Sequence, residues 1–250
     1  MIRENKEVGL ELNTFIFDLD GTLLPMPDQE LFLDTYFSAL TKKLEKEGLE
    51  PQGLMKAIWK STEAMVKNDG SMTNEERFWQ TFCRVFGDEG RKLEPIFDHF
   101  YRNEFCEAKN TTSQHPYAKE CIRILKEKGY QIVVATNPLF PRIATHTRMG
   151  WAGLDPEDFE LITTYENSSY CKPNLNYYRE ILSIIGKTPE QCIMVGNDVK
   201  EDMCVAELGM DTYLLKDCII CSEDLDLSQL KQGSFEDLYE LIKGLPNLNN

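Results

Sequence analysis

The distribution of apolar and polar residues divides the 250-residue chain into three parts. The first contains a short, fully apolar run, Phe15-Ile16-Phe17, which is typical of a strand buried on both faces of a parallel sheet. From about residue 28 to residue 110, apolar residues recur at helical spacing, without a convincing strand pattern. After Thr112, β-rich apolar runs alternate with amphipathic helical stretches. The pattern therefore predicts a strand, a helical segment and an alternating α/β segment, in that order.

Residues 25–111 are predicted to form an all-helical domain inserted after the first strand. Pro25 and Pro27 interrupt the chain directly after that strand, and Thr73-Asn74-Glu75-Glu76 has the pattern of a capping box at a helix start. The aromatic residues in its amphipathic stripes are Phe32, Tyr36, Trp59, Phe78, Trp79, Phe82, Phe86, Phe97, Phe100 and Tyr101. We expect most of them to pack between helices and a minority to line a pocket that faces the strand ends.

The remainder of the chain alternates between predicted strands and predicted helices. Strands are expected at residues 131–136, 159–164, 191–195 and 212–215. Helices are expected at residues 117–128, 142–149, 175–185 and 201–208, and from a capping pattern at residue 234 to about residue 243. Such alternation implies right-handed crossovers and a parallel sheet with helices on both faces. The predicted fold class is α/β: a Rossmann-like three-layer core from residues 1–24 and 112–250, plus the inserted all-α domain.

The charge and hydropathy of the chain exclude several classes of partner. A net charge of −15 disfavours a nucleic-acid-binding surface, which normally needs a basic patch. The same charge opposes an anionic substrate, so a phosphate site would need local positive charge from a metal, a lysine or helix N-termini. No apolar run approaches the roughly 20 residues that cross a bilayer. The polar lead-in at residues 1–13 lacks the apolar core of a secretory signal, and we expect a cytoplasmic protein without a membrane partner.

The eight cysteines are scattered along the chain, and we interpret most of them as small buried apolar residues. Cys218-Ile219-Ile220-Cys221 is a lone Cys-x-x-Cys, without a second pair or a nearby histidine, so a zinc or redox site is not favoured. Cys171 has no evident histidine partner that would activate it as a nucleophile.

Two carboxylates follow the first predicted strand directly. Asp18 and Asp20 are spaced i, i+2, so both side chains can project into one crevice at the strand end. Two anions that close repel each other unless a divalent cation or a shared proton lies between them. Mg2+ prefers carboxylate and carbonyl oxygens, so the pair indicates a metal site. The alternative is that Asp-x-Asp-Gly, with Gly21, is only a turn after a strand.

Polar residues also follow three later predicted strands. Thr136 and Asn137 could hydrogen-bond phosphoryl oxygens, or could serve only in a turn or helix cap. Lys172 could supply a point positive charge, although a surface lysine is the alternative. Asp198 and Asp202 lie four residues apart and can face the same way as a helix begins, where acidic residues also serve as helix caps. Since ligands of parallel α/β sheets bind beyond the carboxyl ends of the strands, these positions are candidate site residues.

The order of these motifs resembles the haloacid dehalogenase-like superfamily, whose members are mostly Mg2+-dependent phosphohydrolases. The resemblance rests on Asp18-Leu19-Asp20-Gly21-Thr22, then Thr136-Asn137, Lys172-Pro173, and Gly196-Asn197-Asp198 with Asp202. It covers essentially the α/β core. The helical insert resembles the small, C1-type α-helical cap of that superfamily. One departure is Asn197, which stands between glycine and aspartate where many relatives have Gly-Asp directly.

The resemblance implies a two-step mechanism through an aspartyl-phosphate. Asp18 would attack phosphorus, and Asp20 would first protonate the leaving oxygen and then activate the hydrolytic water. Mg2+ would be held by the carboxylates of Asp18 and Asp198 and by the main-chain carbonyl of Asp20. The dehalogenating branch of the superfamily lacks the second aspartate, so Asp20 favours phosphate chemistry.

The resemblance also implies roles for the other motif residues. Thr136, the main-chain amide of Asn137, and Lys172 would bind the phosphoryl oxygens and stabilise charge in the transition state. Asp202 would steady Lys172 or a metal-bound water. Arg142, one turn after the Asn137-Pro138 bend, is a weaker candidate for a substrate contact.

The sequence thus predicts a cytoplasmic, Mg2+-dependent phosphatase that acts on a small phosphorylated metabolite. One alternative is a phosphomutase or phosphotransferase, in which the phosphoryl group passes to a sugar hydroxyl instead of water. Another is a catalytically idle binding protein on the same fold, which has no physical need for the repulsion between Asp18 and Asp20. The sequence identifies neither the substrate nor the oligomeric state, which we leave as monomer or homodimer.

Overall fold

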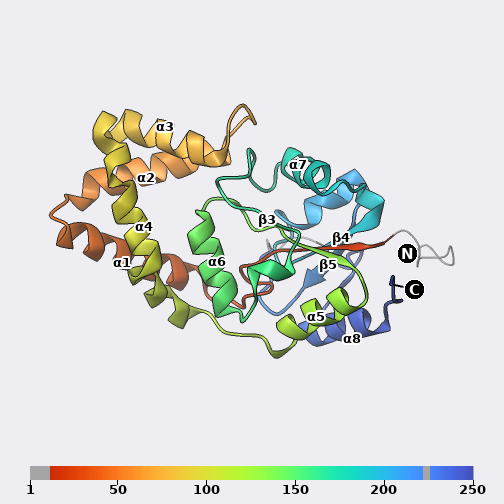
Figure 1. Ribbon diagram of the computed structural model, residues 1–250. Helices are drawn as coiled ribbons and strands as arrows, with labels where there is room; N and C mark the ends of the chain where they lie inside the picture. Colours follow the sequence, from red (N-terminus) through yellow and green to blue (C-terminus); the bar gives the residue numbers. More distant parts are fainter. Residues whose placement is uncertain (1–11, 222–225, 250) are drawn as a thin grey trace.

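Six parallel strands form one sheet in the described part of the chain, residues 12–221 and 226–249 of a computed structural model. The sheet order is β3-β2-β1-β4-β5-β6, which places β1 beside β2 and β4 near the middle (Figure 1). The strands are β1 (Thr14–Phe17), β2 (Gln131–Val134), β3 (Leu161–Ile162), β4 (Cys192–Gly196), β5 (Asp211–Leu215) and β6 (Gln232–Gly233). The α/β fold class with a parallel sheet is confirmed.

The apolar run in β1 is buried on both faces of the sheet, as predicted. Phe15 and Phe17 join the apolar core on one face, whereas Ile16 joins the core on the other face. Alternate residues of a strand point to opposite faces, so three consecutive apolar residues are needed at this central position. The β1 register aligns Phe17 with Val134 of β2 and with Val195 of β4, so the three strands end together.

Helices cover both faces of the sheet, with α7 on one side and α5 and α8 on the other (Figure 1). The α-helices are α1 (Gln29–Lys46), α2 (Pro51–Val66), α3 (Asn74–Phe86), α4 (Glu94–Arg102), α5 (Pro116–Glu127), α6 (Arg142–Trp151), α7 (Leu175–Ile185) and α8 (Phe235–Gly244). Short 3-10 helices are η1 (Asp88–Leu93), η2 (Glu104–Thr111), η3 (Pro156–Asp158), η4 (Pro189–Gln191) and η5 (Met203–Leu208). Of the described helices, none has the length and apolar character that a membrane span requires.

Between β1 and α5 the chain forms α1 to α4 with η1 and η2, which extend to one side of the sheet (Figure 1). The predicted capping box opens α3: the Thr73 hydroxyl accepts from the Glu76 amide at 3.2 Å, and the Glu76 carboxylate accepts from the Thr73 amide at 2.9 Å. The buried side chains of these helices are continuous with the core around α6. Phe105, for example, packs its ring 5.0 Å from that of Trp151.

Two predicted elements differ clearly in extent or type, and one strand was not predicted. The strand expected at residues 159–164 is regular only at Leu161–Ile162, since the amide of Thr164 is bound by the side chain of Asn167 in a turn. The helix expected at residues 201–208 is the 3-10 helix η5, which follows a tight turn at Asp198. Strand β6 has two residues and no apolar run, so it left no pattern in the sequence.

The turn after β1 depends on a glycine. Gly21 has a φ of +85°, and its amide donates to the carbonyl of Leu24 at 2.8 Å. A Cβ at Gly21 would lie 2.3 Å from Nδ2 of Asn197, which is far closer than van der Waals contact. The position therefore excludes a side chain on two grounds, backbone conformation and space. This turn directs Asp18 and Asp20 toward the carboxyl edge of the sheet.

We expect Gly21→Ala to lower the free energy of unfolding by about 2–4 kcal/mol, because both the strained φ and the clash with Asn197 contribute. Gly48→Ala is the matched control, since Gly48 has a φ of +74° but nothing within 4 Å of its added Cβ. That control should lose only about 1 kcal/mol. Urea unfolding followed by circular dichroism measures both. Equal losses in the two variants would show that the space beside Asn197 does not constrain the turn.

Candidate active site

The carboxyl ends of β1, β2 and β4 converge on one cavity of about 190 Å3. Six of the seven predicted site residues line it: Asp18, Asp20, Thr136, Asn137, Asp198 and Asp202. The seventh, Lys172, reaches in from the loop before α7. The main chain fixes the start of this arrangement, because the amide of Asp18 donates to the carbonyl of Val195 in β4 at 2.9 Å.

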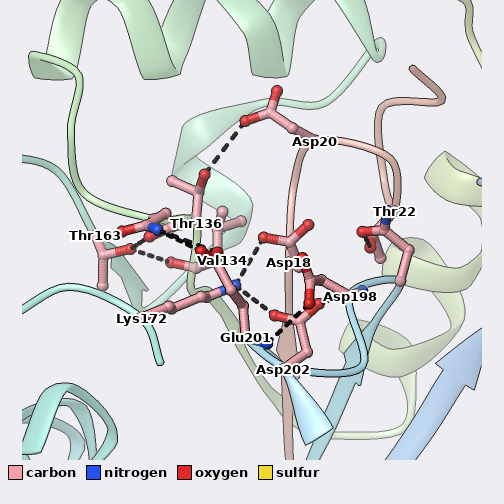
Figure 2. Close-up of polar contacts among 12 residues, drawn as sticks. Asp18, Asp20, Thr22, Val134, Thr136, Thr163, Lys172, Asp198, Glu201 and Asp202 are labelled. Atoms are coloured by element: carbon pink, nitrogen blue, oxygen red, sulfur yellow. Dashed lines mark hydrogen bonds and ion pairs between the residues drawn. The ribbon is translucent and has the colours of Figure 1, made fainter. Parts of the chain in front are cut away.

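Lys172 lies between two carboxylates at the base of the site (Figure 2). Its Nζ donates to Oδ1 of Asp18 at 2.8 Å and to Oδ1 of Asp202 at 2.6 Å. Lys172 and Asp202 are almost fully buried. Burial by itself lowers the pKa of Lys172, but the two carboxylates reverse this effect and hold that pKa well above its ordinary value. Lys172 is therefore a fixed positive charge beside Asp18.

Asp202 also positions the neighbouring acid. Its Oδ2 accepts from the amide of Asp198 at 3.0 Å, so Asp202 links Lys172 to the loop after β4. Gly196 leaves the room for this contact, since a Cβ there would lie 2.1 Å from Oδ2 of Asp202. Burial raises the pKa of Asp202 to about 7, and Lys172 opposes that rise. The predicted role of Asp202 in steadying Lys172 agrees with this geometry.

Asp18 and Asp198 line the same cavity and offer carboxylate oxygens, the donors that a hard cation such as Mg2+ prefers. Hydrogen bonds from Lys172 reach Oδ1 of Asp18, and the amides of Lys200 and Glu201 reach Oδ1 of Asp198. In the part of the chain that the structure describes, no three His, Cys, Asp or Glu side chains are grouped to hold a metal ion. The predicted Mg2+ ligands are two carboxylates and the main-chain carbonyl of Asp20, so this site does not require three such side chains.

Asp20 faces the cavity with different partners from those of Asp18. Its Oδ2 accepts from Arg148 Nη1 at 2.7 Å and from the Thr136 hydroxyl at 3.3 Å. Its Oδ1 is buried without a hydrogen-bond partner among the described residues. Burial raises the pKa of Asp20 above its ordinary value, and the charge of Arg148 partly offsets that rise. A carboxyl group with a raised pKa is suited to give and take a proton.

Arg148 is a site residue that sequence reasoning missed. It lies on α6, is fully buried, and places its guanidinium 4.5 Å from the centre of the Phe140 ring. Arginine on a helix is ordinarily a surface residue, and its partner Asp20 is 128 residues away in the chain. One signal was available: Ala144, Arg148 and Trp151 follow helical spacing on the buried face of α6.

The loop after β2 is held rigidly at Thr136. The carbonyl of Thr136 accepts from the hydroxyl of Thr163 at 2.9 Å and from that of Tyr177 at 2.8 Å. Beside it, Nδ2 of Asn137 donates to both carboxylate oxygens of Glu201 at 3.1 Å. Burial raises the pKa of Glu201, a cavity residue that the sequence did not single out. These contacts fix the main-chain amide and hydroxyl that were predicted to bind phosphate.

Asn197, the departure from the usual motif, connects two loops. Its Oδ1 accepts from the Thr22 hydroxyl at 3.0 Å, and its Nδ2 donates to the carbonyl of Cys218 at 2.7 Å. Asp198 still faces the cavity, so the inserted asparagine does not disturb the site. Cys218 thus binds Asn197 through its main-chain carbonyl. Among the described residues, no cluster of three or more possible metal ligands includes Cys218.

Two weaker candidates from the sequence lie outside the cavity. Burial raises the pKa of the Cys171 thiol to about 12, which leaves it protonated and not nucleophilic at neutral pH. Arg142 is exposed at the start of α6, where its amide donates to the carboxylate of Glu166. Arg142 is not among the residues that line the catalytic cavity, and its substrate contact stays a prediction.

Comparison with known proteins gives consistent similarities over most of the chain. The model of the family described as haloacid dehalogenase-like hydrolase matches residues 12–238. The pyrophosphatase PpaX of Bacillus cereus (strain AH820) is 24% identical over 196 residues, which are 76% of each chain. The glyceraldehyde 3-phosphate phosphatase of Methanothermobacter thermautotrophicus is 27% identical over 213 residues, 82% of this chain and 85% of that protein.

A solved structure supports the fold independently. The crystal structure of the HAD phosphatase from Thermococcus onnurineus superposes with a TM-score of 0.58 at 16% identity, covering 95% of this chain and all of the other. At this identity the likeness bears on the fold alone.

The contact between Arg148 and Asp20 predicts energetic coupling. We expect a double-mutant cycle with Arg148→Met and Asp20→Asn to give a coupling free energy of unfolding of about 1–2 kcal/mol, because each single variant leaves the other charge without its partner. Denaturant unfolding of the four proteins measures it. Arg142→Met, on the exposed side of the same helix, is the control and should couple to Asp20→Asn by less than about 0.5 kcal/mol. Simple additivity of Arg148→Met and Asp20→Asn would contradict the pairing.

Proposed function

The chain belongs to the haloacid dehalogenase-like hydrolase family, and we propose that it is a Mg2+-dependent phosphatase that cleaves small phosphorylated metabolites through an aspartyl-phosphate. The observation that carries the proposal is the pair of acids at the end of β1. Asp18 contacts the fixed cation Lys172, while Asp20, with its raised pKa, shares the same cavity. The relatives named as a pyrophosphatase and as a glyceraldehyde 3-phosphate phosphatase support phosphate chemistry over dehalogenation.

In the first step, a carboxylate oxygen of Asp18 forms a bond to phosphorus while the bond between phosphorus and the alcohol oxygen breaks. Asp20, whose pKa burial raises, would give a proton to that departing oxygen. In the second step, water attacks the phosphorus of the aspartyl-phosphate, Asp20 takes a proton from that water, and the bond to Asp18 breaks. Inorganic phosphate and the free carboxylate of Asp18 result.

The other site residues bind and orient the phosphoryl group. Lys172, the Thr136 hydroxyl and the Asn137 amide are placed to neutralise or hydrogen-bond its oxygens. The 3.3 Å contact of Thr136 with Asp20 is long, so the hydroxyl can exchange this partner for a phosphoryl oxygen. Mg2+, held by the carboxylates of Asp18 and Asp198 and the main-chain carbonyl of Asp20, would neutralise charge on the nucleophile and the phosphate. These cations offset the net charge of −15, which otherwise repels an anion.

The helical segment at residues 25–111 is proposed to act as the cap of this site. It contributes Gln29 to the catalytic cavity and packs against the loop that follows Asn137. A cap that closes over the site would exclude water while the aspartyl-phosphate forms. The cytoplasmic location and the domain boundaries stay predictions.

We expect the folded protein to release inorganic phosphate from a generic aryl phosphate in the presence of Mg2+ and to lose this activity with EDTA. Asp18→Asn and Asp20→Asn should each lower kcat by at least about 1,000-fold, because one removes the nucleophile and the other the proton donor. Asp211→Asn, an exposed aspartate at the start of β5, is the matched control and should retain activity.

Three outcomes would contradict parts of this proposal. Full activity after removal of the metal would contradict the Mg2+ assignment. Transfer of the phosphoryl group to a sugar hydroxyl without free phosphate would identify a phosphomutase. No turnover of any ester in a broad phosphometabolite panel, by folded Mg2+-loaded protein, would overturn the phosphatase itself.

A further inference from the structure

A second cavity, of about 240 Å3, lies between the inserted helices and the loop after β2. Helices α1 to α4 form most of its wall, and residues 139–141 close it on the side of the core. We refer to it as the apolar cavity. Its lining residues include Leu33, Tyr36, Trp59, Tyr101, Leu139 and Phe140.

The apolar cavity adjoins the catalytic cavity through a shared wall. Leu139 and Phe140 line both cavities. The Phe140 ring lies 4.5 Å from the Arg148 guanidinium on one side, and 5.5 Å from the Tyr36 ring, edge to face, on the other. Arg148 in turn binds Asp20, the proposed proton donor. If Asp20 protonates the leaving oxygen, as proposed, the alcohol part of the substrate lies on the side of Asp20, Arg148 and Phe140.

The chemistry of the apolar cavity differs sharply from that of the catalytic cavity. Of the described residues that line it, none is charged, whereas five acids line the catalytic cavity. The hydroxyls of Tyr36 and Tyr101 form one hydrogen bond with each other, at 3.0 Å. A carboxylate or a second phosphate placed here would lose its hydration without gaining a cation, which is strongly unfavourable. An uncharged, apolar group would instead exchange water for aromatic contacts.

The volume of the apolar cavity and the exposed side chains at its rim suit a single aromatic ring. An apolar cavity of about 150 Å3 in another protein holds benzene, so 240 Å3 accommodates one aromatic ring with a short linker. Two large apolar lining residues remain exposed, Trp59 at 53% and Leu33 at 41%. Trp59 packs against Phe37 with ring centres 4.7 Å apart and ring planes tilted by 35°, so aromatic side chains line the rim. A bound ring would cover these side chains.

We propose that the apolar cavity binds the alcohol part of the substrate, and that this part is uncharged, apolar and about the size of one aromatic ring. The inference rests on the proposed phosphatase function and specifies its substrate class. Such a substrate differs from the pyrophosphate and the glyceraldehyde 3-phosphate for which two relatives are named.

The first test compares esters that differ only in charge or apolar size. We expect kcat/KM for 2-phenylethyl phosphate to exceed, by at least about tenfold, the values for its 4-carboxy derivative, glycerol 3-phosphate and pyrophosphate. An equal or higher value for any of these three would overturn the inference, and hydrolysis would still support the proposed function.

The second test removes the aromatic rim. Trp59→Ala should lower the ratio of kcat/KM for 2-phenylethyl phosphate over glycerol 3-phosphate by about tenfold, since an aromatic contact is lost. Val66→Ala is the matched control: Val66 is on the same helix, is 49% exposed, and lies outside the cavity lining, so the ratio should stay unchanged. An unchanged ratio in Trp59→Ala would count against the apolar cavity as the alcohol site.

The third test measures binding without turnover. The non-hydrolysable analogue 2-phenylethylphosphonate, titrated calorimetrically into the Mg2+-loaded protein, should bind at least about tenfold more tightly than its 4-carboxy derivative, and Trp59→Ala should remove that preference. If no ester is hydrolysed but this pattern holds, the proposed function fails and the binding site stands. If esters are hydrolysed but the two phosphonates bind equally, the proposed function stands and the inference fails.

Discussion

The ammonium group of Lys172 between Asp18 and Asp202 is the interaction on which the rest of the site depends. A buried lysine is tolerated only when carboxylates replace the water it has lost, and here both contacts are shorter than 3 Å. The contacts join the loop before α7 to the ends of β1 and β4. Asp202 occupies space that a side chain at residue 196 would need, so glycine at this position leaves room for its carboxylate. Removing Lys172 or one of the two aspartates would leave a buried charge uncompensated, so each of these residues depends on the others.

A second cation resolves the repulsion within the Asp18–Asp20 pair. Two neighbouring carboxylates need a counter-charge, and the sequence alone assigned that role to a divalent cation or a shared proton. In the structure each acid has its own partner instead, Lys172 for Asp18 and Arg148 for Asp20. The repulsion between Asp18 and Asp20 therefore does not by itself require a metal. The proposal of Mg2+ rests on the hard oxygen donors and on the family, and the two acids differ in chemistry because their cations and burial differ.

The sequence predicted those parts of the molecule that follow from local pattern and from the geometry of parallel sheets. The buried run of β1, the α/β alternation and the convergence of six motif residues on one cavity belong to this group. Arg148 and Glu201 were not predicted as site residues. A charged residue in a helical pattern is normally interpreted as a surface residue, and the pattern cannot reveal a partner from a distant segment. The short length of β3 and the presence of the two-residue β6 were not predicted, because turn side chains and sheet edges, not apolar runs, determine the extent of these strands.

The loop after β2 borders both the catalytic cavity and the apolar cavity within the five residues 136–140. Thr136 and Asn137 line the catalytic cavity, and Leu139 and Phe140 line both this cavity and the apolar cavity. The carbonyl of Thr136 is fixed by two hydroxyls, and the amide of Leu139 donates to the carbonyl of Asn137, so the segment cannot deform easily. Phe140 also lies under Arg148, which binds Asp20. A group bound against Phe140 would therefore contact the side chain that packs on Arg148, the ion-pair partner of Asp20, which we propose as the proton donor.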